Sequence, residues 1–320
     1  MVLVFIDHAE GQIKKSSLEA LSYGVKIAEL LNTEAEGILL GTVTSNLADL
    51  GKYGAKKIYQ VSSESLNHLD SQADAKVLTE VVNATGAKVI VFSNNLSGKA
   101  IAPRLSASLR AALVTGAVAL PETTSGFVVK KTVFSGKAFA HVSLNTPIKI
   151  ISINPNSYQV VEGSGTAEVV PLNVEIKDSK IKVSGVSKTS GEVPLTEAEI
   201  VVSGGRGLKG PENWGMIEDL ARLLHGATAC SRPVADAHWR PHNEHVGQTG
   251  IAIAPNLYIA IGISGAIQHL AGVNRSKVIV VINKDPEAPF FKAADYGIVG
   301  DAFEIVPKLI EAVKKLKGVA

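Results

Sequence analysis

The segment spanning residues 257–289 constrains the fold of this chain most, because it has the order strand, glycine turn, short helix, strand and polar turn. Its first part, Leu257–Ile261, is a short apolar run, and the turn after it contains Gly262 and Gly265. A helix that starts beside such a turn points its free backbone N–H groups toward it, where an anion such as a pyrophosphate can bind. The apolar residues 277–282 predict a second buried strand that ends at the same edge of a parallel sheet. The segment therefore predicts a nucleotide site in an α/β fold.

Length and composition favour a soluble α/β protein with two domains. A chain of 320 residues is long for one domain, and hydrophobic residues make up 46% of it against 19% charged residues. The 32 basic and 30 acidic residues are spread along the chain and leave a formal charge of +2. We therefore expect no nucleic-acid partner. No apolar run approaches the roughly 20 residues that a membrane span needs, so we expect no direct membrane insertion.

Two further features concern the compartment. The single cysteine, Cys230, excludes an intrachain disulfide. The first residues, MVLVFIDHAEG, lack the basic segment of a secretory signal, and Asp7 interrupts their apolar run early. We expect a cytoplasmic, bacterial protein without a signal or transit peptide.

Apolar runs and helical patterns alternate through the first half of the chain. This alternation predicts a mostly parallel sheet flanked by helices. The expected strands are residues 2–6, 35–40, 57–61 and 88–92, and the expected helices lie near residues 16–31, 46–52, 71–84 and 100–112.

The pattern changes after Gly126 to short strands divided by glycine and proline turns, which predicts an antiparallel appendage. Its expected strands are residues 127–133, 138–143, 148–153 and 169–172, with a further one at 180–183. The polar residues 184–193 are the best linker candidate. The expected domains are therefore an N-terminal α/β domain, residues 1–188, and a C-terminal domain, residues 189–320.

The C-terminal domain opens with an expected strand, residues 198–203, a glycine turn and a helix near residues 212–224. Gly205, Gly207 and Gly210 match the G-x-G-x-x-G pattern of dinucleotide-binding turns. The next strand lacks the acidic residue that would hold a ribose, which weakens this interpretation. Arg206 and Arg232 favour a phosphate or an electron-rich ring instead, although two turns with a purely structural role remain an alternative.

The loop after Cys230 contains three histidines, His238, His242 and His245, which together with the cysteine could indicate a zinc site. We expect no metal, because structural zinc sites favour paired short spacings such as C-x₂-C. Cys230 has strand-like neighbours and no His–Asp pair tied to it, so a buried structural thiol is favoured over a nucleophile. The small residues 247–250 would let the backbone approach a planar ring.

Together these segments closely resemble the alpha subunit of electron-transferring flavoproteins. The run LYIAIGISGAIQHLAG carries most of the specificity, whereas the N-terminal half resembles the family in pattern only. The matching segments are residues 203–207, 229–232, 246–250, 257–272, 282–286 and 293–299.

The resemblance implies a Rossmann-like domain that binds FAD at the carboxyl edge of its sheet. It also implies a heterodimer, in which the N-terminal domain contacts a smaller beta subunit that covers the flavin and carries AMP. The positions that match the family's FAD contacts are Arg206, Ser231, Arg232, Val246, Gly247, Gln248, Thr249, Ser264, Gly265, Ala266, Ile267, Gln268, His269, Asn283, Asp301 and Ala302.

These residues have chemically reasonable roles at a flavin. Residues 264–267 would present hydroxyl and N–H groups to the pyrophosphate, and Asn283 and Asp301 would bind the adenosine half. Reduction leaves negative charge on the flavin ring, which a positive or donating group stabilises. The candidates for this tuning are Arg232 and His269, with Gln248 and Thr249 as further donors.

The function implied by the resemblance is electron carriage, without a substrate bond made or broken. The donors would be flavoprotein dehydrogenases of the acyl-CoA type, as in fatty acid oxidation, and the acceptor a membrane quinone oxidoreductase. One alternative is the alpha subunit of an NADH-dependent electron-bifurcating flavoprotein. The alternative from another class is a nicotinamide-dependent oxidoreductase that uses the turn at Gly205.

Overall fold

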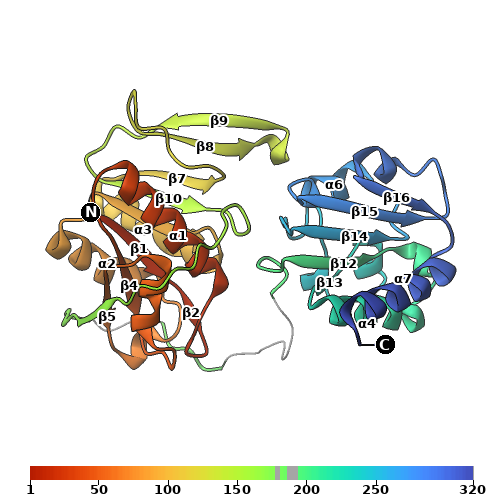
Figure 1. Ribbon diagram of the computed structural model, residues 1–320, viewed down its shortest axis with the longest axis horizontal. Coiled ribbons are helices and arrows are strands. Elements are labelled where there is room, and N and C mark those ends of the chain that lie inside the picture. Colours follow the sequence, from red (N-terminus) through yellow and green to blue (C-terminus); the bar gives the residue numbers. More distant parts are fainter. Residues whose placement is uncertain (177–180, 186–193, 320) are drawn as a thin grey trace. The chain divides into compact units, whose positions relative to one another are not determined.

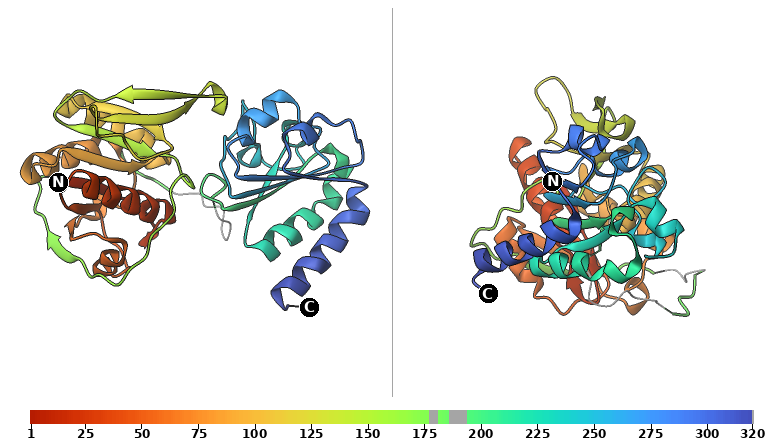
Figure 2. Two further views of the ribbon diagram at one scale, coloured as in Figure 1. Left: turned by 45° about the horizontal axis from the view of Figure 1, so that its top comes forward. Right: turned by 90° about the vertical axis from the view of Figure 1, so that its right-hand side faces the viewer.

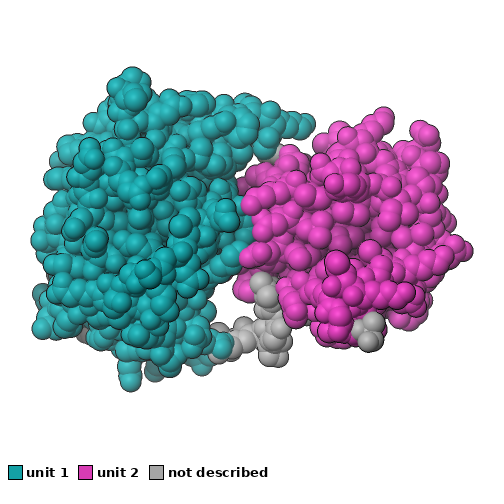
Figure 3. Space-filling view, in the orientation of Figure 1, with its two compact units in different colours: residues 1–188 teal, residues 189–320 magenta. Residues whose placement is uncertain are grey.

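A computed structural model describes residues 1–176, 181–185 and 194–319. The chain divides into two compact units, Met1–Lys188 and Thr189–Ala320, which Figure 3 shows in different colours. Each unit has its own sheet and its own hydrophobic core (Figure 1). Most of the expected linker, from residue 186 to residue 193, lies outside the described residues.

The first unit contains a nine-stranded sheet with the order β11-β5-β4-β1-β6-β10-β7-β8-β9. All neighbours from β11 to β7 pair in parallel. The chain adds β4 and β5 on one side of β1 and then crosses to β6 on its other side, so β1 lies where the strand order reverses. The parallel strands are β1 (Val2–Ile6), β4 (Ala35–Leu40), β5 (Lys57–Val61), β6 (Val89–Ser93), β7 (Ala112–Ala117), β10 (Lys149–Ile153) and β11 (Glu168–Pro171).

Helices cover both faces of this sheet. Alternate side chains of β1 point to opposite faces, so that Val4 packs in one core cluster and Leu3 in another. Helix α1 (Lys15–Leu30) buries Leu21 in the first cluster, whereas α2 (Ser71–Thr85) and α3 (Leu96–Leu109) contribute to the second. The short 3₁₀ segments are η1 (Leu47–Tyr53), η2 (Glu64–Leu66) and η3 (Phe134–Gly136).

Several expectations for this unit are wrong. Helix α3 begins at Leu96 rather than near residue 100, because the Asn95 side chain accepts a hydrogen bond from the backbone N–H of Gly98 and caps the helix there. It ends before the unpredicted strand β7. Only β8 (Val128–Val133) and β9 (Ala138–Ser143) form an antiparallel appendage, which Figure 2 shows as a two-stranded ribbon.

The other two strands expected in the appendage belong to the parallel part of the nine-stranded sheet. Strand β10 lies between β6 and β7 in parallel, and β11 pairs in parallel with β5 at the opposite edge. Strand β10 reads IIS at its centre and is buried on both faces, as the interior of a parallel sheet requires. Of the further strand expected at 180–183, residue 180 lies outside the described residues, and residues 181–183 are not in a strand. A two-residue hairpin pair, β2 (His8–Ala9) and β3 (Gln12–Ile13), follows β1.

The second unit is a five-stranded parallel sheet with the order β13-β12-β14-β15-β16. In chain order this is 2-1-3-4-5, a doubly wound arrangement whose switch point lies between β12 and β14. The strands are β12 (Ile200–Gly204), β13 (Ala227–Cys230), β14 (Leu257–Ile261), β15 (Val278–Asn283) and β16 (Tyr296–Val299).

Helices flank this sheet as well. Helices α4 (Gly215–Leu224) and α7 (Ala302–Lys317) lie side by side and share one core cluster (Figures 1 and 2). Helix α6 (Ile267–Val273) and segment η7 (Pro289–Ala293) contribute to the cluster on the other face. Short helical segments η4 (Arg206–Leu208), η5 (Pro211–Asn213), α5 (Arg232–Asp236) and η6 (His242–Glu244) complete the unit. The expected fold class, α/β with a mostly parallel sheet flanked by helices in both domains, is confirmed.

Candidate functional site

A cavity of 880 Å³ opens at the carboxyl edge of the second sheet. Its walls come from the segments that follow β12, β13, β14 and β15, and therefore from both sides of the switch point. Ligands of doubly wound sheets bind in this place. The lining residues are Arg206, Gly207, Ser231, Arg232, Pro233, Asp236, Ala237, His245, Val246, Gly247, Gln248, Thr249, Gly262, Ile263, Ser264, Ala266, Gln268, His269, Asn283, Asp285 and Ala288.

Most of the predicted FAD contacts line this cavity, but Gly265, Ile267, Asp301 and Ala302 do not. Gly265 has φ +82° and lies against Phe290, where a Cβ atom would come within 2.4 Å of the phenylalanine Cβ. Its small size therefore serves the packing of the turn. Asp301 caps α7 by accepting a hydrogen bond of 2.9 Å from the Phe303 N–H.

The three glycines of the G-x-G-x-x-G pattern have a structural explanation. A Cβ on Gly205 would lie 2.2 Å from the carbonyl oxygen of Gly262, and one on Gly207 would lie 2.6 Å from the Gly262 Cα. The Gly207 N–H also donates to that carbonyl oxygen at 3.0 Å. These glycines therefore let the turns after β12 and β14 touch through their backbones. A Cβ on Gly210 would meet the carboxylate of Glu212.

Arg232 occupies the first position of α5, where its guanidinium lies at the cavity but remains 62% exposed. Its Nε donates to Asp236 Oδ2 at 3.2 Å, within the same short helix. The ion pair offsets part of the positive charge that Arg232 brings to the cavity, and solvent screens it further. Asp236 was not predicted as a cavity residue.

His269 is the buried polar group of the cavity. It is 7% exposed, and its Nε2 lies 2.8 Å from the hydroxyl of fully buried Tyr258. Its Nδ1 makes no hydrogen bond of good geometry to the described residues, although the backbone of Val246 lies close enough to interact with the ring and to oppose the lowering of its pKa. Burial lowers the pKa of His269 to about 4, with the neighbouring His245 adding to the shift, so the ring is neutral at physiological pH.

Gln248 and Thr249 are exposed at the cavity in the loop that joins α5 to β14. The backbone N–H of Gln248 donates to the Gln268 carbonyl at 2.7 Å and so ties this loop to the start of α6. Gly247 adopts φ +153° and Gly272 packs against its backbone, so both positions require small residues. The loop therefore holds two polar side chains on a close-packed backbone.

Asn283 ends β15 and links the neighbouring turn to it. Its Nδ2 donates to the Ile263 carbonyl at 3.0 Å, and its Oδ1 accepts from the Asp285 N–H at 3.0 Å. These contacts position the turn between β14 and α6 against β15.

Sequence reasoning missed several lining residues. From the sequence, His245 was considered only as a zinc ligand. The structure shows that it lines the cavity, is 6% exposed, and pairs with Cys230 through an isolated backbone β-bridge next to Val246. Its place directly before the predicted run 246–249 was a usable signal. No sequence signal marked Pro233, Ala237 or Ala288, which become neighbours only when the strand ends meet, whereas Asp285 lies within the matching segment 282–286 but was not chosen as a contact.

Cys230 is fully buried at the end of β13 and faces the core cluster. Burial raises the pKa of its thiol to about 12, with Glu244 nearby adding to the shift, so the nucleophilic thiolate is disfavoured. Across the described residues, no group of three or more His, Cys, Asp or Glu side chains is arranged to hold a metal ion. None of the described helices is long and apolar enough to cross a membrane.

Comparison with known proteins identifies the family. A model described as "electron transfer flavoprotein domain" matches residues 2–177, and one described as "electron transfer flavoprotein FAD-binding domain" matches residues 194–274. The electron transfer flavoprotein subunit alpha of Bacillus subtilis (strain 168) is 37% identical over 319 residues, covering 98% of each chain. The chain belongs to the electron transfer flavoprotein alpha-subunit family.

Other family members match over similar lengths. The alpha subunit of Thermoanaerobacterium thermosaccharolyticum is 35% identical and covers 99% of this chain and 98% of that protein. Protein FixB of Clostridium saccharobutylicum is 33% identical and covers 98% and 96%. As an alpha subunit of this family, the chain is an electron-transfer protein rather than a substrate-converting enzyme, has a flavin-binding domain, and pairs with a beta subunit. The nicotinamide-dependent oxidoreductase is therefore not supported.

Proposed function

We propose that this chain carries electrons with FAD held in the cavity of its second unit. It would accept them from flavoprotein dehydrogenases of the acyl-CoA type and deliver them to a membrane quinone oxidoreductase, while the beta subunit covers the flavin and holds AMP. The observation that carries the proposal is His269, a buried ring at the cavity whose Nδ1 makes no hydrogen bond of good geometry within the described chain, the weak contact with the Val246 backbone aside. A polar atom buried in this way is expected to bind a ligand.

The residues around the cavity fit a flavin nucleotide in charge and in hydrogen bonding. Arg206 and Arg232 both bring positive charge to the cavity: that of Arg206 suits a pyrophosphate, and that of Arg232 suits the negative charge of a reduced ring. Ser264 is exposed on the turn before α6 and can donate its hydroxyl hydrogen to the same group. Gln248 and Thr249 offer donors and acceptors to the heteroatoms of a ring. When bound, a flavin supplies reversible acceptance and release of electrons.

In this proposal His269 acts as a neutral donor. The Tyr258 hydroxyl is kept protonated because burial raises its pKa far above the usual value. If that hydroxyl donates to Nε2, the single ring hydrogen of the neutral imidazole lies on Nδ1 and can be donated into the cavity. Such a donor strengthens its hydrogen bond when negative charge develops on a bound ring, and so stabilises the reduced form.

The test is to purify the chain with its beta subunit, denature the heterodimer and quantify the released nucleotides. We expect FAD and AMP in equal amounts, together with a flavin absorption spectrum before denaturation. Two FAD per heterodimer would instead indicate the electron-bifurcating alternative. A colourless protein that releases only a nicotinamide nucleotide would refute the proposal.

A further inference from the structure

The first unit contains a cavity of 730 Å³ that the proposed electron carriage does not use. It lies at the carboxyl edge of the nine-stranded sheet, where β1 and β4 end and where the strand order reverses at β1. This is the usual place for a ligand in a doubly wound sheet. Its volume is within the range of about 300–1,000 Å³ that is typical of small-molecule sites.

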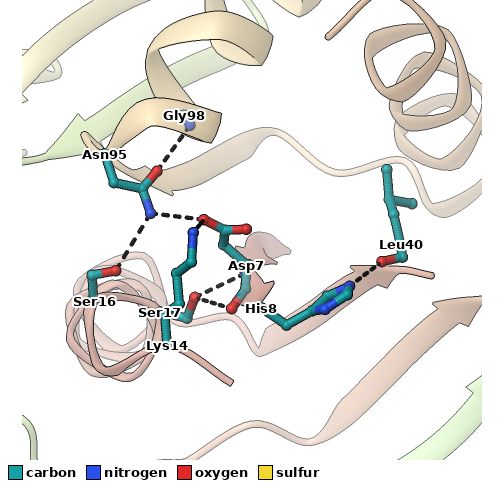
Figure 4. Close-up of polar contacts among 8 residues, drawn as sticks. All are labelled: Asp7, His8, Lys14, Ser16, Ser17, Leu40, Asn95 and Gly98. Carbon is teal, nitrogen blue, oxygen red and sulfur yellow. Dashed lines mark hydrogen bonds and ion pairs between the residues drawn. The ribbon is translucent and has the colours of Figure 1, made fainter. Parts of the chain in front are cut away.

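Asp7 directly follows β1, is buried, and accepts the side-chain hydrogen bonds drawn in Figure 4. Its Oδ2 accepts hydrogen bonds from Lys14 Nζ at 2.7 Å and from Asn95 Nδ2 at 2.8 Å. Asn95 in turn caps α3 through Gly98. Within the described chain only this oxygen of the Asp7 carboxylate accepts a hydrogen bond, so the Oδ1 atom has free acceptor capacity.

His8 provides a second acceptor at the cavity. Its Nε2 lies 2.9 Å from the carbonyl oxygen of Leu40, which can only accept, so Nε2 carries the hydrogen (Figure 4). In the neutral ring Nδ1 then has a lone pair. This Nδ1 atom is buried and makes no hydrogen bond to the described residues.

Asp74 on α2 provides the third acceptor and is the most deeply buried of the three. The residue is 4% exposed, and its Oδ1 atom has no partner in the described structure. Burial raises the pKa of Asp74 to about 7, with repulsion from Asp70 and Asp7 adding to the shift and a backbone hydrogen bond from Asp70 opposing it. A carboxyl group in a cavity whose pKa is raised in this way is typical of functional sites.

The chemistry of these groups defines the ligand class. Three unsatisfied acceptors require a ligand that supplies several O–H or N–H hydrogens, as the hydroxyls of a ribose do. Asp7, Glu10 and Asp74 line the cavity with one lysine, Lys14, which already pairs with Asp7. This excess of carboxylates opposes a phosphate group. The apolar part of the wall, which suits a flat heterocyclic ring, consists of Phe5, Leu40, Val43, Leu66, Leu69, Leu96 and Ile101.

We propose that the cavity of the first unit binds a ribonucleoside without a phosphate group, with its ribose hydroxyls donating to Asp7, His8 and Asp74 and its base against the apolar wall. The site is independent of the proposed FAD cavity, because every residue that forms it belongs to the first unit. Failure of one proposal therefore leaves the other intact.

The test is equilibrium dialysis of the purified heterodimer with radiolabelled adenosine and uridine. We expect saturable binding of at least one of them. The binding that counts is the part lost in the Asp74→Asn variant described below, because AMP held by the beta subunit is unaffected by that change. For this part, adenine and uracil, which lack ribose, and the corresponding 5′-monophosphates should each bind at least about ten-fold more weakly than the better nucleoside. A monophosphate that binds this Asp74-dependent site as tightly as its nucleoside, or no nucleoside binding at all, would overturn the proposal.

Variants of this chain separate the site from nucleotide sites elsewhere in the heterodimer. Asp74→Asn keeps the size of the side chain and removes its charge, and should weaken nucleoside binding about ten-fold. Asp219→Asn, a change at an exposed aspartate of the second unit, is the matched control and should leave binding unchanged. Leu96→Trp is a second probe, since Leu96 lines the cavity while being 76% exposed, and a larger side chain there should obstruct entry without disturbing a core. Binding that neither Asp74→Asn nor Leu96→Trp alters would place the nucleoside elsewhere and refute the site.

Discussion

The buried carboxyl group of Asp74 should make the stability of the first unit fall as pH rises. Its pKa is about 7 in the folded protein against the ordinary value of 3.8. Between these values the folded protein keeps the proton that the unfolded chain has released, so each pH unit lowers the free energy of unfolding by about 1.4 kcal/mol. This loss of unfolding free energy is absent below pH 3.8 and reaches about 4 kcal/mol above pH 7.

Asp74→Asn isolates this contribution, because asparagine has nearly the same shape and does not ionise. The difference in unfolding free energy between variant and wild type should grow by about 4 kcal/mol in favour of the variant from pH 4 to pH 8. Titrating groups that do not interact with Asp74 cancel in that difference, whereas Asp70 and Asp7, whose charges raise the pKa of Asp74, do not cancel fully.

Hydrogen–deuterium exchange of peptides from β1 and β6 measures the opening of the first unit, after correction for the intrinsic exchange rate at each pH. Tryptophan fluorescence is unsuitable, because both tryptophans, Trp214 and Trp239, lie in the second unit. If the difference in unfolding free energy between the variant and the wild type does not change with pH, or grows toward acid, then burial does not raise the pKa of Asp74 in the folded protein.

Three further predictions concern the second unit. Arg232→Ala should leave FAD bound and lower the flavin reduction potential by on the order of tens of millivolts. The effect is modest because the guanidinium is exposed and paired with Asp236. The control, Arg222→Ala, removes a similar exposed pair with Asp219 and should leave the potential unchanged. Tyr258→Phe should lower the potential and change the ¹⁵N shifts of the His269 ring as its tautomer is released, whereas Tyr23→Phe, which also removes a hydroxyl but in the first unit, should change neither. Gly265→Ala should abolish FAD retention, because a Cβ would lie 2.5 Å from the Phe290 Cα in a turn with φ +82°, while Gly215→Ala, where a Cβ has no atom within 4 Å, should be tolerated; a Gly265→Ala protein with normal FAD content would contradict this account of the turn.

The local pattern was sufficient to predict the fold class and many elements. Strand Val2–Ile6 has the predicted bounds, since an unbroken apolar run between turn residues leaves little freedom in where a strand ends. The run 148–153 shows where local pattern fails. It has the composition of a strand, but whether it joins an antiparallel ribbon or enters a parallel sheet as β10 depends on which neighbours are free to pair with it.

For the proposed FAD site, the sequence by itself determined which segments lie at the carboxyl edge of the second sheet, because strand direction and chain order require it. Tertiary structure decided what each residue does there. It brings the glycines at 205 and 207 into backbone contact with Gly262, and it makes Asp301 the cap of α7.

The cavity of the first unit was not predicted at all. Asp7 and His8 lie next to each other after β1, whereas Asp74 lies far along the chain in α2, and none of them belongs to a recognisable motif. The unsatisfied acceptor atoms of His8 and Asp74 exist only because packing removes water and leaves no protein donor within reach. Sequence patterns record which residues are apolar and where turns occur, whereas the burial and pairing of individual polar atoms are properties of the packed structure.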